Sequence, residues 1–217
     1  KKVRCATILS GGFSESGSEG NDFEKHVFKI AKKGDLRILG PNSIGLINIS
    51  DNVILSANAM LELQDLKKGS LGVISHSGSL IGALLAHGHS RGIGFSKLVS
   101  VGNESDLSVG EIGKMLVNDP NTDTIILFLE TLRNSSEVAE MSRMAHAAGK
   151  QIICYKLGKS ELGKELAKSH TGAIAGNDDA FNAFINYHGI ARVEIFETLI
   201  EIPNLFKNKK RSESKRV

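Results

Sequence analysis

Apolar and polar positions alternate along this chain in two periods, which together define the expected elements. Short continuous apolar runs are typical of buried strands, whereas apolar residues three or four positions apart are typical of amphipathic helices. The expected strands are 71–75, 95–101, 124–130, 151–157 and 192–196, and the expected helices are 78–88, 109–117, 136–148, 178–188 and 198–206. This regular alternation of strand and helix predicts an α/β fold with a doubly wound, flavodoxin-like parallel sheet.

The N-terminal part of the chain shows the same alternation more weakly. The expected elements there are a strand at 4–9, a helix at 23–33, a strand at 36–39, a tight loop at 40–45 and a short apolar piece at 53–57. A polar stretch at 64–70 follows them, and we place a domain boundary there. We therefore expect domains at 1–65 and 66–206, and a basic tail at 207–217. Because the chain runs into a strand almost at once without a methionine, we expect a fragment of a longer protein.

Composition narrows the class of protein. The chain has 217 residues, of which 41% are hydrophobic and 24% charged, so it can bury a sizeable core. The net charge of +3 is modest, and the basic tail carries no interleaved aromatic residues, which argues against nucleic-acid binding. No apolar run approaches the length of a membrane span. Cys5 and Cys154 lie in strand-like runs without metal-like spacing, so we expect no metal site and two reduced core cysteines in a cytoplasmic protein.

Polar residues gather where the expected strands end. The sequence SHSGS at 75–79 joins a strand to a helix, whose first backbone N–H groups favour an anion. Glu130 ends the third strand of the 66–206 segment, and the fourth strand leads to His170 in a run of small residues at 169–176. Because parallel strands end at one edge of a sheet, a phosphate site, a carboxylate and a histidine are expected on one rim.

Two chemistries fit such a rim. His170 could accept a phosphoryl group while Glu130 holds the imidazole in the tautomer that leaves one nitrogen nucleophilic. Alternatively, His170 could act as a general base on a bound substrate. The expected anion site favours the first. Simpler interpretations stay open, in which Ser77 and Ser79 only cap a helix and Glu130 pairs with a lysine. For His76 we expect no role.

Four motifs, taken in order, resemble the nucleotide-diphosphate-forming acyl-CoA synthetases. They are GPNSIGLIN at 40–48, SHSGS at 75–79, SVGNESD at 100–106 and SHTGA at 169–173. These enzymes are relatives of the α subunit of succinyl-CoA synthetase, and the closer match is to the ADP-forming acetyl-CoA synthetases. The resemblance covers about residues 5 to 200. It implies a succinyl-CoA synthetase-like domain preceded by the C-terminal part of a Rossmann-like CoA-binding domain.

The resemblance also implies a reaction and roles for residues. It implies an acid–thiol ligase that reversibly converts acyl-CoA, phosphate and ADP to acid, CoA and ATP through a phosphohistidine. His170 matches the phosphorylated histidine, and Glu130 matches the carboxylate that steadies it. The phosphate-binding helix start is matched by Ser77, Gly78 and Ser79.

The remaining expectations concern CoA, nucleotide and partners. The residues expected near CoA and the acyl substrate are Asn42, Ser43, Gly45, Gly102 and Asn103, although many relatives carry Cys where Ser43 stands. The cofactors implied are CoA and ATP or ADP with Mg²⁺. The glycine-rich CoA loop of the family should lie upstream of Lys1, and an ATP-grasp subunit or domain should supply the nucleotide site. We expect a small carboxylic acid as substrate, an oligomer, and no turnover by this chain alone.

Two alternatives belong to other classes. Some relatives carry these domains as a CoA-sensing or acyl-CoA-sensing module of a larger protein, such as a protein acetyltransferase, without ligase activity. The presence of His170 together with Glu130 argues against that. A phosphoryl-receiver domain would need clustered acidic residues for Mg²⁺, and the rim offers only Glu104, Asp106 and Glu130. We rank it last.

Overall fold

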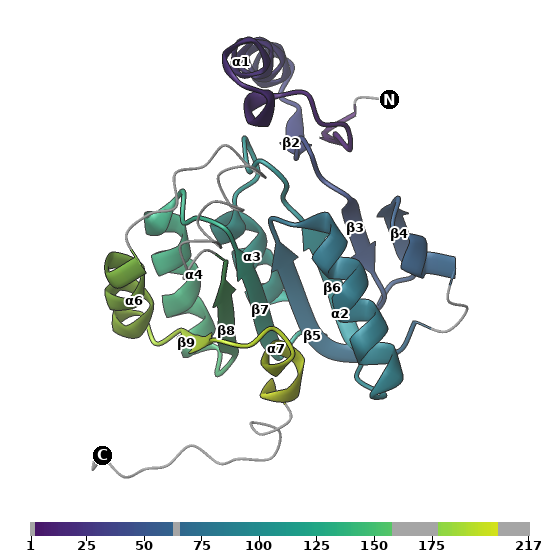
Figure 1. Ribbon diagram of the computed structural model, residues 1–217, viewed down its shortest axis with the longest axis vertical. Helices are drawn as coiled ribbons and strands as arrows, with labels where there is room; N and C mark the ends of the chain where they lie inside the picture. Colours follow the sequence, from purple (N-terminus) through teal and green to yellow (C-terminus); the bar gives the residue numbers. More distant parts are fainter. Residues whose placement is uncertain (1–2, 63–65, 158–177, 204–217) are drawn as a thin grey trace.

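One seven-stranded sheet with helices on both faces forms the body of the protein (Figure 1). The computed structural model describes residues 3–62, 66–157 and 178–203. The strands are β3 (Gly45–Asn48), β4 (Val53–Ser56), β5 (Lys68–Ser75), β6 (Phe95–Ser100), β7 (Thr124–Leu129), β8 (Gln151–Lys156) and β9 (Ala191–Val193). The helices around this sheet are α2 (Gly78–Ser90), α3 (Val109–Asn118), α4 (Ser135–Ala147), α6 (Asp178–Tyr187) and α7 (Thr198–Glu201).

Strands β5 to β9 confirm the flavodoxin-like prediction. They are parallel and lie in the order β6-β5-β7-β8-β9, which is second-first-third-fourth-fifth along the chain. That is the flavodoxin order, in which the strand sequence reverses beside the first strand. The point of reversal lies between β5 and β7, where ligands bind in such sheets.

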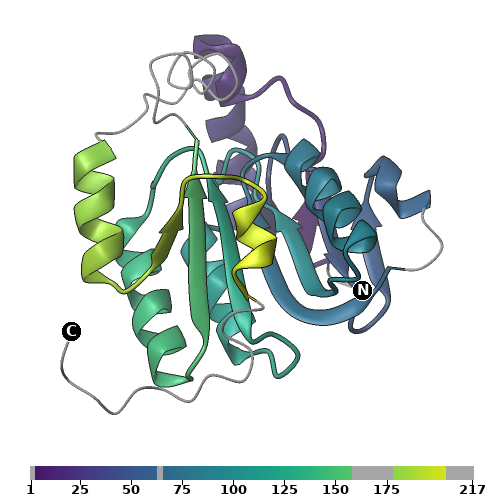
Figure 2. The ribbon, with the colours of Figure 1, turned by 60° about the horizontal axis from the view of Figure 1, so that its bottom comes forward.

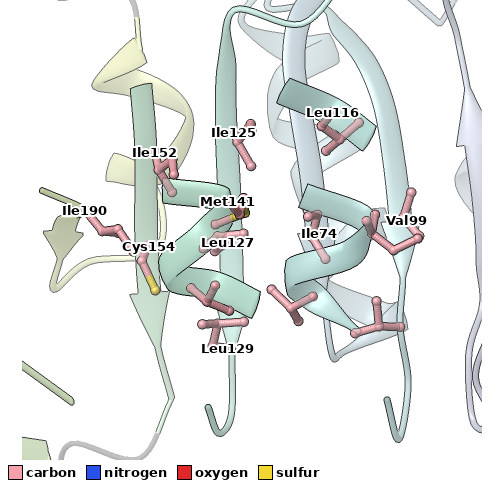
Figure 3. Packing of buried hydrophobic residues seen from close by; sticks show 14 of the residues in the cluster. Ile74, Val99, Leu116, Ile125, Leu127, Leu129, Met141, Ile152, Cys154 and Ile190 are labelled. Atoms are coloured by element: carbon pink, nitrogen blue, oxygen red, sulfur yellow. The ribbon is translucent and has the colours of Figure 1, made fainter. Parts of the chain in front are cut away.

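The central strand β7 is buried along its whole length, as its continuous apolar run predicts. Its alternate side chains enter two separate cores. Ile125, Leu127 and Leu129 pack on the face covered by α3 and α4 (Figure 3), while Ile126 and Phe128 pack on the opposite face. Cys154 is fully buried in the first core, and this burial raises the pKa of its thiol to about 12. Its prediction as a core cysteine is confirmed.

A hairpin that the sequence pattern did not predict extends one edge of the sheet. β3 and β4 are antiparallel to each other, and β3 is antiparallel to β6. Gly45, which we expected in a tight loop, begins β3 with φ +93°, and a Cβ there would lie 2.0 Å from the Leu55 carbonyl oxygen. The hydrogen bonds between β3 and β6 cross the boundary expected at 64–70. The division into 1–65 and 66–206 stays a prediction.

The first residues form a separate β-α-β unit, as predicted. β1 (Cys5–Thr7) and β2 (Arg37–Leu39) pair in parallel, and α1 (Ser18–Lys33) connects them. The prediction for Cys5 was wrong: this residue is exposed, because β1 forms an edge of a sheet with only two strands. Among the described helices, none has the length and apolar character needed to cross a membrane.

Helices α3 and α4 approach each other so closely that two positions on α3 require glycine. A Cβ on Gly110 would lie 2.4 Å from the Glu137 Cβ and 2.8 Å from the Val138 nitrogen. A Cβ on Gly113 would lie 2.0 Å from the Met141 sulfur. Gly110 tolerates an added side chain less well than Gly113, because the backbone of α4 cannot move aside as the flexible Met141 thioether can.

We predict that Gly110→Ala destabilises the fold by about 1–3 kcal/mol, because the added methyl group forces the two helices apart. Urea denaturation gives the change in unfolding free energy. Gly34→Ala is the matched control, since a Cβ there would lie 3.5 Å from the nearest atom, an ordinary contact. Equal stability of the two variants would contradict the close helix contact.

Candidate functional site

The candidate site lies at the carboxyl ends of β6, β5 and β7. The polar residues after these strands are Gly102 to Asp106, His76 to Ser79, and Glu130. Figure 1 places α1 and β2 beyond this end of the sheet, and Figure 2 shows α1 at the same end. Hydrogen bonds confirm that placement, since the Asn103 side-chain amide donates to Glu15 at 2.5 Å and to Ser14 at 3.2 Å.

Ser77 occupies the N-cap position of α2, but its hydroxyl does not cap the helix. The Ser77 Oγ lies 3.0 Å from the Ser79 Oγ, and it accepts no hydrogen bond from the first-turn N–H groups. The helix start therefore keeps N–H groups and a partial positive charge available for an anion. Gly78 packs against Ile44, whose Cβ would lie 2.7 Å from a Cβ at that position. The glycine thus lets the 40–45 loop lie against the helix start.

Glu130 is buried at the point where the strand order reverses. It is 3% exposed, and within the described residues its Oε2 has no hydrogen-bond partner. In the same part of the chain no lysine or arginine forms an ion pair with it. Burial of a carboxylate oxygen without a partner costs several kcal/mol. Glu130 is therefore set apart from ordinary rim carboxylates, and the pairing with a lysine that we left open is not observed among the residues that the structure describes.

His170 and the rest of the 158–177 segment lie outside the described residues. The described chain nevertheless fixes where this segment leaves and returns. Lys156 pairs in register with Leu129, so the segment begins beside the strand end that carries Glu130. The described residues continue from Asp178, the first residue of α6.

Buried ion pairs join the two ends of this segment. The Lys156 Nζ lies 3.5 Å from the Asp178 Oδ1, and Arg192 donates to both Asp178 oxygens at 3.0 Å. The side chains of Lys156 and Arg192 are only 2% and 9% exposed. Burial raises the pKa of Asp178, but the hydrogen bonds and charge of Arg192 outweigh this and hold the pKa below its usual value. The Asp178 carboxylate thus lies between two buried cations, Lys156 and Arg192.

The five residues expected near CoA come from two loops that the structure brings together. The Asn103 N–H donates to the Pro41 carbonyl at 2.9 Å, and the Asn42 amide donates to the Asn103 Oδ1 at 3.4 Å. Gly102 has φ +56°, and a Cβ on it would lie 2.0 Å from the Pro41 oxygen. Ser43 is buried, and its hydroxyl donates to the Ser100 carbonyl at 2.7 Å and accepts from the Gly45 N–H at 2.9 Å. The Ser43 hydroxyl therefore serves the loop itself.

Sequence reasoning missed His76, which we expected to have no role. The residue is buried between the ends of three strands, where its Nε2 lies 3.0 Å from the Glu104 Oε2 and its Nδ1 accepts from the Glu130 N–H at 3.0 Å. Glu104 in turn accepts from the Val109 N–H at 2.8 Å. The sequence held one indication of a role for His76, its position directly after a buried strand, because a polar residue there lies on the rim.

Comparison with known proteins confirms the family resemblance. The family model of the succinyl-CoA ligase-like flavodoxin domain matches residues 68–206. The chain is 34% identical over 208 residues to acetate–CoA ligase (ADP-forming) II of Archaeoglobus fulgidus, covering 95% of this chain and 30% of that protein. It is 32% identical over 206 residues to the α subunit of acetate–CoA ligase (ADP-forming) II of Pyrococcus furiosus, covering 95% of this chain and 44% of the subunit.

A solved structure of a relative has the same fold. The dinucleotide-forming acetyl-coenzyme A synthetase 1 of Ca. Korarchaeum cryptofilum, in complex with phosphate and ADP, superposes with a TM-score of 0.83 at 29% identity. The match covers 92% of this chain and 42% of that one. The chain thus spans less than half the length of each of these relatives.

We predict that Asp178→Asn costs about 3 kcal/mol of stability at pH 7, because it removes the carboxylate that pairs with buried Lys156 and leaves buried Arg192 with the more distant Glu194 at 3.6 Å. The pKa of Asp178 is lowered in the folded state, so this stabilisation is present above the usual carboxyl pKa near 4 and lost as the pH falls further. The difference between wild type and variant should therefore shrink between pH 7 and pH 3, as urea denaturation would measure. Asp22→Asn is the control, since its pair with Lys25 is exposed. A pH-independent difference would contradict the prediction.

Proposed function

The chain belongs to the succinyl-CoA ligase-like flavodoxin domain family, and from that premise we propose that it is the CoA-ligase part of an ADP-forming acyl-CoA synthetase. The proposed enzyme interconverts acyl-CoA, phosphate and ADP with a small carboxylic acid, CoA and ATP. The phosphoryl group passes through a phosphohistidine on His170. The rest of the enzyme supplies the nucleotide site.

Glu130 carries this proposal. Its buried Oε2 lacks a hydrogen-bond donor among the described residues, and the segment that bears His170 begins at the neighbouring strand end. An imidazole N–H would satisfy that oxygen. It would also fix the tautomer, because a ring that donates through one nitrogen is left with a lone pair on the other. That lone pair is the nucleophile a phosphohistidine requires.

The start of α2 supplies the complementary charge. Its uncapped N–H groups and the hydroxyls of Ser77 and Ser79 lie at the same rim, where they can hydrogen-bond the oxygens of a phosphate. Donors that are already oriented stabilise the negative charge that develops during transfer without further rearrangement. In this proposal Ser77, Gly78 and Ser79 hold the phosphoryl group, and Glu130 holds its acceptor.

We assign CoA to the paired loops at the same rim. The residues proposed to face it are Asn42, Ser43, Gly45, Gly102 and Asn103, and the close approach of Gly102 to Pro41 holds the two loops in one place. Ser43 cannot act as a thiol, and its hydroxyl is already engaged. CoA supplies the thiol that carries the acyl group, while the residues named here only bind and orient.

The nucleotide and Mg²⁺ are assigned to an ATP-grasp subunit or domain outside this chain. Support comes from a relative named as an α subunit and from another solved with ADP, both longer than this chain. A cytoplasmic, oligomeric enzyme follows from the same proposal. The alternative, a CoA-sensing module without ligase activity, would have no need for a phosphorylated histidine.

We predict a phosphohistidine on His170. The chain, assembled with its nucleotide-binding part and Mg-ATP, should gain about 80 Da by intact-mass spectrometry at alkaline pH and lose it in acid, because phosphoramidates are acid-labile. Peptide mapping should place the group on His170, and His170→Asn should abolish it. Absence of the adduct with a competent partner would favour the sensing module.

We predict that Glu130→Gln slows phosphorylation of His170 at least tenfold, because a neutral amide orients and stabilises the ring less well than a carboxylate. The KM for CoA should not change, since Glu130 is not assigned to CoA. Rapid-quench measurement of phosphoryl incorporation tests this. Glu140→Gln, on the exposed part of α4, is the control. An unchanged rate would leave Glu130 a buried residue without a part in the transfer.

A further inference from the structure

His76 occupies a position that the proposed chemistry does not explain. Its side chain is 3% exposed and lies directly after β5, inside the SHSGS motif. Although it is a histidine at a phosphate-binding rim, it is unsuited to carry a phosphoryl group. Both ring nitrogens are engaged within the protein, one by Glu104 and one by the Glu130 backbone. Its role must therefore be sought in those two contacts.

The His76 ring extends the β5–β7 ladder by one hydrogen bond. The His76 N–H donates to the Phe128 carbonyl at 3.2 Å, so in an uninterrupted parallel ladder the Glu130 N–H would next donate to the His76 carbonyl. Instead it donates to the His76 Nδ1 at 3.0 Å. The backbone of Glu130 is thus anchored by a side chain at the point where the strand turns into its loop.

These contacts determine the protonation of the ring. A backbone N–H can only donate, so the Nδ1 must carry a lone pair. The Nε2 then carries the proton and donates it to the Glu104 carboxylate, 3.0 Å away. Glu104 is itself held by the Val109 N–H and has φ +54°, a conformation uncommon outside glycine. Glu104 therefore selects the tautomer that lets His76 accept from Glu130.

We propose that His76 is a positioning residue, which holds the Glu130 carboxylate in place for the phosphohistidine through its Nδ1. The proposal rests on the proposed function. Glu130 must meet the imidazole of His170 within hydrogen-bonding distance, and a shift of its backbone would misplace the carboxylate. The Nδ1 contact is the part of His76 that matters, and the Nε2 contact with Glu104 keeps the ring in the required tautomer.

Two substitutions separate the two contacts. In His76→Asn the side-chain oxygen takes the place of the Nδ1 and can accept from the Glu130 N–H, but the side chain is too short to reach Glu104. In His76→Gln the side-chain nitrogen takes the place of the Nε2 and can donate to Glu104, while the Glu130 N–H loses its acceptor. His76→Ala removes both contacts. His89→Asn is the control, because His89 is an exposed histidine near the end of α2.

The experiment measures the rate of phosphoryl incorporation at His170 in the assembled enzyme, together with the KM for CoA and for phosphate. Each variant is compared below its own melting temperature. We expect about tenfold slower incorporation for the glutamine and alanine variants, as for one lost hydrogen bond, and a rate within about threefold of wild type for the asparagine variant. The two KM values should stay unchanged in all of them.

The possible outcomes distinguish a failure of the proposed function from a failure of the positioning role of His76. Wild-type enzyme without a phosphohistidine overturns the proposed function, and the role of His76 with it. Wild-type phosphorylation with no effect of His76→Gln overturns the positioning role alone. An asparagine variant as slow as the alanine variant, with a similar loss of thermal stability, shows that His76 only stabilises the rim. Rescue by asparagine but not by glutamine supports the assignment.

Discussion

Buried polar groups at the carboxyl ends of β5, β6 and β7 must all find hydrogen-bond partners, and the rest of the site depends on this requirement. Both faces of these strands are covered, and His76, Ser77 and Glu130 at their ends are buried. Ser43, His76 and Glu104 supply the missing partners from side chains. The loops at the rim are consequently fixed by the same bonds that complete the sheet, whereas Glu130, directly after β7, keeps a buried oxygen without a hydrogen-bond partner among the described residues.

Much of this arrangement could be predicted from the sequence because it follows from periodicity. The continuous apolar run of β7 requires cover on both faces, and a parallel sheet covered on both faces requires crossover helices. Once the strands are parallel, their carboxyl ends meet at one edge. The placement of Ser77 and Glu130 on a common rim therefore followed from the order of elements alone, and the structure has both of them there.

What could not be predicted depends on contacts between distant residues. β3 is too short to show a period, and its pairing with β4 depends on Gly45, which allows the Leu55 carbonyl to approach. His76 looks in sequence like any buried histidine, because its partners lie 28 and 54 residues away. Cys5 has an apolar setting in sequence, but its strand pairs on one side only. Pattern reasoning assigns residues to elements, whereas packing decides which of their atoms meet.

The ion pairs around Asp178 and the hydrogen bonds around His76 bear on two requirements of the proposed reaction, the position of Glu130 and the position of the segment that bears His170. The proposed phosphoryl transfer would require the Glu130 carboxylate to hold its position, and the segment that bears His170 to begin and end at defined points. His76 accepts a hydrogen bond from the Glu130 N–H, and in our proposal this contact meets the first requirement. Lys156 and Arg192 fix the second, because they bind Asp178 at one end while Lys156 itself forms the other. Since Lys156 of β8 pairs in register with Leu129 of β7, the two sets of contacts lie at the neighbouring ends of these two strands. Weakening either one should therefore misalign the same pair of groups.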